Sequence, residues 1–530
     1  MNEVTGYLQG NELVIALSGR IDSNNAQQVE EEINRLIAEN ACDSLRLDLE
    51  ELEYISSAGL RTLLRLRKAY GDLRLMNVGP EVFEILHMTG FTELMTVEKT
   101  YRRVSVDGCE VIGQGANGTV YRIDGDSVVK AYNNADALEE IQHEREVARL
   151  ALVLGIPTAI SYDVVRVGDS FGSVFELLDA KSFSKILATQ PEKLDWCVEE
   201  YVDLLRKIHR TVVPEGSLPD QRQVAIGWAN FVQEYLPEEE GRKLVRLVRA
   251  VPKDDHMIHG DYHTKNIQLT GDEVLLIDMD TLAVGHPIFE LASMYNAFVG
   301  FGEYDNGATT DKFMGFDHRI AHNFWKRALA AYLGTDDEEK IREVEDKARI
   351  VGYTRLIRRS IRRKGLEDPE KAAEIELWKT RLIELLGRID SLTFLPYEIK
   401  LEAEKEKLPD VIAFADAHLE KAECPVKTQM EIELALEEIF INIAKYAYAP
   451  GAGEATIKVE VTGEPKTAVI TLKDQGMPYN PLEKDDPDVS LTAEERDIGG
   501  LGIFLTRKTM DDIEYNYCDG SNILTMKKKL

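Results

Sequence analysis

The sequence has few cysteines, no long apolar run and a shortage of basic residues. Five cysteines in 530 residues are scattered without a CxxC pair, so a disulfide framework or a zinc ribbon has little support. The 63 Lys and Arg residues against 94 Asp and Glu give a net charge of −31, which repels polyanions, so neither nucleic acid nor an anionic membrane is expected as a direct partner. No eighteen apolar residues follow one another, and the N-terminus lacks a basic start followed by an apolar run. These absences predict a soluble protein of a reducing, cytoplasmic compartment.

A chain of this length is expected to form about three or four domains. Its first hundred residues alternate strand patterns (ELVIALSG, SLRLDLEEL, DLRLMNVG) with helical ones, which predicts an α/β domain with a mixed or parallel sheet. Ser56 and Ser57 fall between the second strand and a helix expected from Leu60. The unpaired N–H groups of a helix N-terminus tolerate a phosphate there, although serines at this position are usually only N-caps.

Three segments, LSGRIDSNNA, LDLEELEYISSAGLRTLL and the closing MTGF, resemble the STAS family of anti-sigma factor antagonists across about residues 1–100. The resemblance implies that a serine in this turn is phosphorylated by a partner kinase and that phosphorylation breaks the complex. Ser56 stands where the family usually has an acidic residue before the acceptor, which leaves the choice between Ser56 and Ser57 open. Ser57 is the favoured acceptor and Ser56 the alternate. The acceptor and N-cap roles can hold together.

The segment predicted as the second domain, residues 103–390, opens on VIGQGANGTVYRIDGDSVVKAY, where glycines separate two strand patterns. These glycines are Gly113, Gly115 and Gly118. A dinucleotide-binding loop needs a helix at the third glycine, whereas strands joined by an Asp-Gly turn follow here, so a kinase-type glycine flap over ATP fits better. Lys130 then lies on a strand from which a lysine reaches nucleotide phosphates, and Glu146 in the next helix is a candidate to pair with it.

The segment IHGDYHTKN and the later VLLIDMD carry the stronger signal for phosphoryl transfer. This chemistry needs a carboxylate near the attacking hydroxyl, which Asp261 supplies, and oxygen ligands for Mg²⁺, which Asn266 and Asp278 supply. The segments resemble the aminoglycoside phosphotransferase and choline kinase-like family, which implies a bilobal kinase-like domain and a small hydroxylated substrate. Glu290 stands where that family usually has an aspartate. A basic patch at residues 355–364 could hold an anionic substrate or an acidic neighbouring domain, or be a solvated helix face.

The last domain is predicted from residue 393 to 530, beginning with a strand in LTFLPYEIKLEAE. Glu438 and Asn442 lie four apart on one helix face, where a carboxylate and an amide carbonyl suit magnesium and an activated hydroxyl. Asp474 ends a hairpin, placed to accept a hydrogen bond from an adenine amino group, and Gly476 allows a sharp turn after it. Three further glycines, at the start of another helix, allow the backbone to approach phosphates: Gly499, Gly500 and Gly502.

Together these segments resemble the anti-sigma factor serine kinases of the GHKL ATPase group, which implies an α/β sandwich that binds ATP and Mg²⁺. The resemblance implies Glu438 as base, Asn442 on the metal, Asp474 at the adenine and Thr525 beside it. Tyr446 stands where many relatives carry histidine.

The three resemblances predict a partner-switching signalling protein, in which the C-terminal site phosphorylates Ser57 of this chain or of a separate STAS antagonist, with a sigma factor or that antagonist as partner. Two alternatives remain open. One is a small-molecule hydroxyl kinase that the flanking domains regulate, and the other is a scaffold whose ATP sites bind without catalysis.

Overall fold

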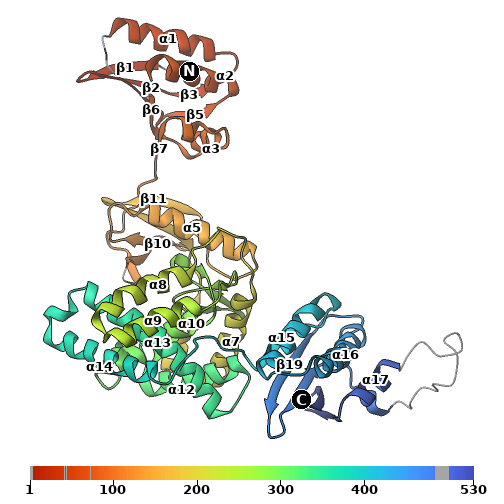
Figure 1. The fold of residues 1–530 in the computed structure, drawn as a ribbon. Helices are drawn as coiled ribbons and strands as arrows, with labels where there is room; N and C mark the ends of the chain where they lie inside the picture. Colours follow the sequence, from red (N-terminus) through yellow and green to blue (C-terminus); the bar gives the residue numbers. More distant parts are fainter. Residues whose placement is uncertain (1–3, 41, 43, 72, 116, 484–500) are drawn as a thin grey trace, which may run out of the picture. The chain divides into compact units, whose positions relative to one another are not determined.

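The computed structural model describes residues 4–40, 42, 44–71, 73–115, 117–483 and 501–530 (Figure 1). The chain forms two compact units, residues 1–146 with 159–178 and residues 147–158 with 179–530. This division falls inside the segment predicted as one kinase-like domain, so its two lobes belong to different units.

The N-terminal part of the first unit is a five-stranded sheet with the order β1-β2-β4-β6-β7, and a pair of short strands, β3 and β5. Only β1 runs antiparallel to its neighbour, so the sheet is mixed, one of the two forms predicted. Its core consists of leucine, isoleucine and valine side chains from the strands and from α1, α2 and α3. The elements are β1 Val4–Gln9, β2 Glu12–Leu17, β3 Gly19–Ile21, α1 Ala26–Glu39, β4 Ser44–Asp48, β5 Leu52–Ile55, α2 Ser57–Tyr70, β6 Leu73–Val78, α3 Pro80–Met88, α4 Phe91–Leu94 and β7 Thr96–Lys99.

The rest of the first unit is an antiparallel sheet with the order β11-β12-β10-β9-β8, accompanied by the start of α5. Strands β8 and β9 form a hairpin around the glycine segment, and β9 turns into β10 at the Asp-Gly pair, as predicted. The elements are β8 Glu110–Gln114, β9 Gly118–Arg122, β10 Ser127–Tyr132, α5 Leu138–Val153, β11 Asp163–Val167 and β12 Ser170–Glu176.

The second unit begins with a helical lobe around one large apolar core, with small strand pairings that carry the IHGDYHTKN segment. Among the described residues, none of the helices combines the length and the apolar character that a membrane crossing requires. The elements are β13 Ala180–Ser182, α6 Phe183–Thr189, α7 Leu194–Arg210, α8 Gln221–Val232, α9 Glu238–Ala250, β14 Met257–Ile258, β15 Ile267–Thr270, β16 Glu273–Leu276, β17 Ala283–Val284, α10 Ile288–Phe298, α11 Ala308–Met314, α12 His318–Leu333, α13 Glu338–Arg362 and α14 Pro369–Leu386.

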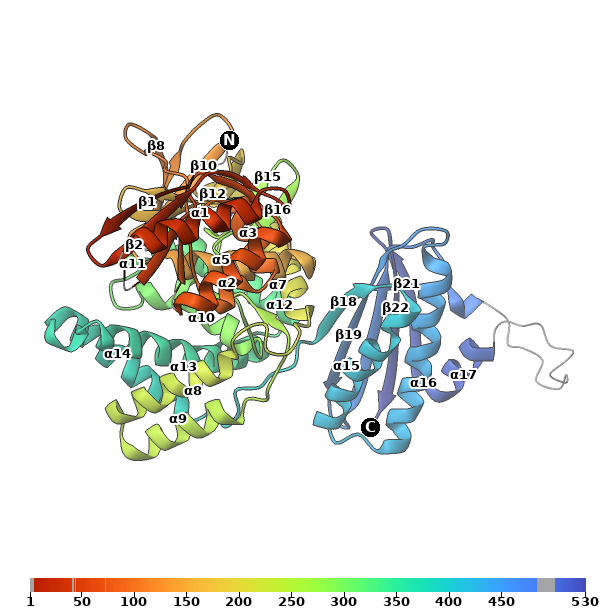
Figure 2. The same ribbon diagram turned by 90° about the horizontal axis from the view of Figure 1, so that it is seen from above.

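The C-terminal part of the second unit is an antiparallel sheet with the order β18-β19-β20-β22-β21, and Figure 2 shows α15 and α16 along one of its faces. Helix α16 continues into a π-helical turn, η7 Ile443–Ala447, directly after Asn442. The elements are β18 Glu398–Glu402, α15 Leu408–Lys421, α16 Val426–Asn442, β19 Glu454–Thr462, β20 Thr467–Asp474, α17 Leu501–Thr509, β21 Asp512–Cys518 and β22 Ser521–Lys529.

The strand predicted from residue 393 is shorter than expected, because β18 begins only at Glu398. The apolar residues before it are used elsewhere: Leu392 and Phe394 are buried in the core of the helical lobe. The ring of Phe394 lies 5.4 Å from that of His286 and 6.5 Å from that of Tyr332. The apolar pattern was therefore real, but it marks a segment anchored on the helical lobe rather than a strand of the sheet.

Candidate functional site

In the first unit, Lys130 pairs with Glu144 and not with Glu146. The Lys130 Nζ atom lies 3.0 Å from both carboxylate oxygens of Glu144, and the two side chains are 16% and 11% exposed. Glu146 is exposed, because two residues along an α-helix point to nearly opposite sides. The predicted pairing with Glu146 is therefore wrong. Periodicity could have found the partner, since Glu144 shares the buried helix face of Ile141 and Ala148.

Among the glycines of the β8–β9 hairpin, Gly118 has the least room for a side chain. A Cβ atom at Gly118 would lie 2.3 Å from the carbonyl oxygen of Ala131 on β10, so no larger residue fits. The N–H of Gly115 donates to the carbonyl of Gly118 at 2.9 Å, which closes the tip of the hairpin. A Cβ atom at Gly113 would meet only the side chain of Val120, at an ordinary van der Waals distance of 3.7 Å. The hairpin geometry fits a flap of backbone N–H groups and does not fit a dinucleotide-binding helix.

In the second unit, Asp261 lies in the loop after β14 and is held between two histidines. Its N–H donates to His259 Nδ1 at 3.3 Å, and its Oδ2 lies 3.4 Å from His263 Nε2. Burial alone would raise the pKa of Asp261, but the hydrogen bond from His263 and the charges of His263, Arg355 and His259 outweigh it and hold the pKa at about 2. Asp261 is therefore ionised at neutral pH, as a proton acceptor must be.

Glu290, which replaces the usual aspartate, holds the backbone of this loop. Its carboxylate is fully buried and accepts hydrogen bonds from the N–H groups of His259 and Gly260, the latter at 3.1 Å. Burial raises the pKa of Glu290 to about 7, and the backbone N–H donors oppose that shift. Gly260 has φ +81°, and a Cβ there would lie 2.6 Å from the carbonyl of Thr281. Glu290 therefore anchors the backbone of this loop although it replaces the usual aspartate.

The two predicted magnesium ligands of this lobe lie at one end of the β15–β16 hairpin. Asn266 precedes β15 and Asp278 follows β16, and the N–H of Ile277 donates to the carbonyl of Asn266 at 2.9 Å. The Nδ2 atom of Asn266 donates to the Asp261 carbonyl at 3.1 Å, which leaves the Oδ1 atom of Asn266 as a possible metal ligand. Asp278 has φ +65°, a strained conformation that clusters at functional sites. One amide oxygen and one carboxylate are the hard ligands that Mg²⁺ prefers.

In the C-terminal domain, Glu438 and Asn442 are brought together as predicted. The Nδ2 atom of Asn442 donates to Glu438 Oε1 at 2.9 Å, which again leaves an amide oxygen for a metal. Gly502 of α17 lies against the same carboxyl group, because a Cβ there would be 1.9 Å from its Cδ. Gly499 and Gly500 lie outside the described residues. An alanine at position 502 would therefore require the carboxyl group of Glu438 or the start of α17 to shift.

Asp474 is held by a residue that the sequence did not indicate, Asn522 of β22. Asp474 Oδ1 accepts from Asn522 Nδ2 at 2.8 Å and from the Gly476 N–H at 2.9 Å. A Cβ at Gly476 would lie 2.4 Å from the carbonyl of Ala447 in the π-helical turn. Thr525 lies on β22, with its Oγ1 3.2 Å from Thr471 Oγ1. No spacing rule links residues 474 and 522, because only strand pairing places them side by side.

The serine turn of the first unit begins α2 at Ser57, three residues earlier than expected, because Ser56 caps the helix. Ser56 Oγ accepts from the N–H of Gly59 at 3.5 Å, whereas Ser57 is exposed. A Cβ at Gly59 would meet Ile55 at 2.7 Å, so the helix start is tightly packed. Ser56 thus has a structural role, and Ser57 is accessible to another protein.

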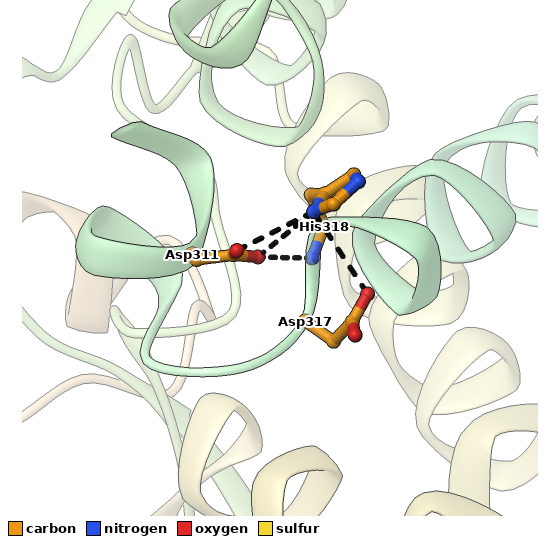
Figure 3. Close-up of side chains that lie close together, drawn as sticks. All are labelled: Asp311, Asp317 and His318. Atoms are coloured by element: carbon orange, nitrogen blue, oxygen red, sulfur yellow. Dashed lines mark hydrogen bonds and ion pairs between the residues drawn. The ribbon is translucent and has the colours of Figure 1, made fainter. Parts of the chain in front are cut away.

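Asp311, Asp317 and His318, at the junction of α11 and α12, are the one group of three His, Cys, Asp or Glu side chains in the described part of the chain whose ligand atoms lie within 4.8 Å of one another (Figure 3). The Nδ1 atom of His318 lies 3.2 Å from Asp311 Oδ1 and 3.9 Å from Asp317 Oδ1. Asp317 also accepts from the N–H of Arg319 at 2.8 Å and so caps α12. These contacts explain the group as a helix junction, and we assign no metal to it.

Three protein families match this chain in succession. Residues 5–105 match the STAS domain, residues 108–343 the phosphotransferase enzyme family APH, and residues 401–528 the histidine kinase-like ATPase domain. A Bordetella bronchiseptica protein named as an anti-sigma factor antagonist, BtrV, is 37% identical over 89 residues, which cover 16% of this chain and 76% of that protein. The serine/threonine-protein kinase BtrW of the same organism is 26% identical over 100 residues, 19% of this chain and 70% of that protein.

Solved structures resemble the middle of the chain only distantly. A thermostable mutant of the aminoglycoside phosphotransferase APH(4)-Ia is 12% identical with a TM-score of 0.36, covering 53% of this chain and 94% of that chain. A choline/ethanolamine kinase family protein from Mesorhizobium loti is 16% identical, also with a TM-score of 0.36, covering 53% and 88%. Likenesses at this level carry no weight for function.

The matched domains define an ATP-dependent phosphotransferase of the partner-switching type. The chain belongs to the STAS family of anti-sigma factor antagonists through residues 5–105, and it joins to that domain an APH phosphotransferase domain and a histidine kinase-like ATPase domain.

Proposed function

We propose that the C-terminal ATPase domain phosphorylates Ser57 of a STAS domain with ATP and Mg²⁺, and that this phosphate switches the binding of an anti-sigma or sigma partner. The observation that carries the proposal is the Glu438–Asn442 pair, a carboxylate and an amide held 2.9 Å apart. The matches to an antagonist and a kinase of one organism support it, because both functions lie here in one chain.

The chemistry assigned to the pair follows from its donor set. Glu438 would accept the proton of the attacking serine hydroxyl, and Asn442 would hold Mg²⁺ through Oδ1. Bound Mg²⁺ would neutralise charge that develops on the phosphate oxygens. Asp474, fixed by Asn522, would accept from the adenine amino group.

Ser57 suits the acceptor role because it is exposed at the first position of α2. A phosphate there would add nearly two negative charges beside the N–H groups of the helix, which stabilise it in place. In a chain of net charge −31 the same phosphate would repel an acidic partner surface. Phosphorylation therefore changes binding without unfolding the domain.

The test is labelling of the purified full chain with γ-labelled ATP and Mg²⁺. We expect label on the protein to fall at least tenfold in Ser57→Ala and separately in Glu438→Ala, while Ser56→Ala keeps most of it. A dilution series distinguishes phosphate transfer within one chain from transfer between two chains, because only the rate within one chain is independent of protein concentration. Unchanged labelling in both Ser57→Ala and Glu438→Ala contradicts the proposal.

The middle domain supports a second function, transfer of phosphate from ATP to the hydroxyl of a small molecule. The specific observation is geometric: Asp261 Oδ2 lies 3.4 Å from His263 Nε2, and the Asp261 carbonyl accepts from Asn266 Nδ2 at 3.1 Å, so the proposed base and a proposed Mg²⁺ ligand share one loop. Asp261→Asn would then abolish labelling of the small molecule and leave serine labelling unchanged. The two activities are thus separable in one protein.

A further inference from the structure

The second half of α13 carries a dense group of cations, which we call the α13 cluster. Its members are Arg355, Arg358, Arg359, Arg362 and Arg363. Among the described residues, no carboxylate lies within ion-pair distance of any of these five arginines. In a chain with 31 more acidic than basic residues, so many arginines without a carboxylate partner require an explanation.

The cluster begins at the catalytic loop. Arg355 Nη1 donates to the carbonyl of Gly260 at 3.0 Å and lies 2.9 Å from Ser293 Oγ, and Ser293 donates to the same carbonyl at 2.9 Å. Arg355 therefore binds the residue directly before Asp261. The charge of Arg355 is one of those that keep Asp261 ionised.

The next turn of α13 remains within the electrostatic reach of the base. Burial is the first cause that lowers the pKa of Arg359, followed by the charges of Arg363 and Arg355, and Asp261 acts in the opposite direction. Asp261 is therefore within electrostatic reach of Arg359, whose side chain is exposed.

Aromatic rings connect the cluster to the loop. The guanidinium of Arg355 lies 5.6 Å from the ring of Trp228, and that of Arg359 lies 5.9 Å from Phe301. Phe313 lies 5.1 Å from Phe301 and 5.1 Å from the ring of His263, the partner of Asp261. Such rings hold guanidinium groups in fixed positions through cation–π contact.

We propose that the acceptor of the middle domain is a small hydroxylated molecule that already bears a phosphate, which the α13 cluster binds while its hydroxyl lies at Asp261. This inference rests on the phosphotransferase function proposed for the middle domain. Arginines bind phosphate through paired hydrogen bonds and repel cationic compounds. The acceptor is thus an anionic compound, and a polycationic compound is excluded as the acceptor.

In the reaction, the acceptor hydroxyl oxygen attacks the γ-phosphorus of ATP and forms a new O–P bond. The bond from that phosphorus to the bridging oxygen of the β-phosphate breaks, and ADP leaves with that electron pair. The hydroxyl proton passes to Asp261 and then to solvent. The product carries two phosphates, and no oxidant or reductant is needed.

Binding is tested on the full chain with three sugars that share one ring: glucose 6-phosphate, glucose and glucosamine, at pH 7. A non-hydrolysable ATP analogue with Mg²⁺ is present at saturation. It occupies the ATP sites, so that binding of glucose 6-phosphate to those sites does not contribute to the signal. All four tryptophans lie between residues 196 and 378, so their fluorescence reports on the helical lobe. We expect saturable binding of glucose 6-phosphate at least tenfold tighter than of glucose, and none of glucosamine.

The variant Arg359→Glu should weaken binding of glucose 6-phosphate at least tenfold, whereas Lys207→Glu, an exposed cation on α7 of the same lobe, should not. Thermal unfolding followed by tryptophan fluorescence checks that each variant folds. Asp261→Asn should keep binding and lose transfer, so failure of the phosphotransferase function is distinct from failure of this inference. Equal binding of the three sugars, no binding of glucose 6-phosphate, or equal effects of the two charge reversals overturns it.

Discussion

At the scale of single residues, buried carboxylates decide how the two lobes of the middle domain are organised. Glu144 pairs with Lys130 and also accepts from the hydroxyl of Tyr132, so one side chain serves two groups of β10. Glu290 instead accepts hydrogen bonds from backbone N–H groups, and it forms no ion pair with any cation in the described part of the chain. A buried carboxylate with only neutral donors keeps its proton to higher pH than a paired one.

The titration of Glu290 gives a pH-dependent contribution to stability. Its pKa is raised from 4.5 to about 7, so the folded state holds this proton more tightly than the unfolded state. That contribution is complete below pH 4.5 and is lost as the pH rises through about 7. We expect the free-energy difference between wild type and Glu290→Gln to fall by on the order of 3 kcal/mol over this range.

The measurement is denaturant unfolding followed by tryptophan fluorescence, which reports on the helical lobe because all four tryptophans lie there. Glu192→Gln, an exposed carboxylate of the same lobe, is the matched control and should show no such trend. A difference between wild type and Glu290→Gln that stays constant from pH 4.5 to 8 would contradict the assigned burial effect.

At the scale of elements, helix starts and strand pairs place the candidate site residues. The β15–β16 hairpin places Asn266 and Asp278 at one end, and the β20–β22 pairing places Asn522 beside Asp474. In the C-terminal domain, the start of α17 lies against α16 at Gly502, where a Cβ atom would meet the carboxyl group of Glu438. The position of the proposed base therefore depends on the absence of a side chain on the facing helix.

Gly502→Ala tests this contact between α16 and α17. The new methyl group would lie 1.9 Å from the carboxyl carbon of Glu438, so either the carboxylate or the start of α17 must move. Because a displacement of about 1 Å can cost about a hundredfold in rate, we expect serine labelling to fall by about that factor. Gly227→Ala on α8, where the added methyl meets nothing within 4 Å, serves as control. Full labelling activity in Gly502→Ala would show that Glu438 is not the base.

At the scale of the whole molecule, the segment before β18 ties the ATPase domain to the helical lobe of the second unit. Lys347 Nζ donates to the carbonyl of Thr393 at 2.8 Å, and Phe394 is buried in the helical core. Arg206, which is 13% exposed, lies 3.2 Å from Glu398 of β18. An anchored connection restricts the motion of the ATPase domain more than a free polar linker would.

Phe394→Ala should release this connection. Replacing a buried phenylalanine by alanine costs about 3–5 kcal/mol of stability in a core. Here the change weakens the packing of the segment before β18 against the helical lobe. We expect limited trypsin digestion to cut after Arg388 several-fold faster in the variant, with the two fragments resolved on a gel. Leu366→Ala is a suitable control because this leucine is 48% exposed. Equal cleavage rates in the variant and the wild type would contradict an anchored segment.

Motifs that lie within a few residues of each other were predictable from the sequence. The ISSAG turn, the glycine hairpin, the segment around Asp261 and the Glu438–Asn442 pair depend on local spacing, which helix and strand periodicity preserves. The partner of Lys130 was mispredicted, although Glu144 lies on the buried face of α5 with Ile141. The strand from residue 393 was mispredicted because apolar residues of a docked segment have the same pattern as a strand.

By itself, the sequence determined the classes of three successive domains, because short motifs resemble known families, and it supplied candidate residues for phosphate transfer from ATP. Only the tertiary structure decided that Asn522 holds Asp474, that Glu290 anchors the loop of Asp261, and that Arg355 joins the α13 cluster to that loop. These pairs are separated by 48, 30 and 95 residues. Contacts over such distances are set by how strands and helices pack, and no local pattern records them.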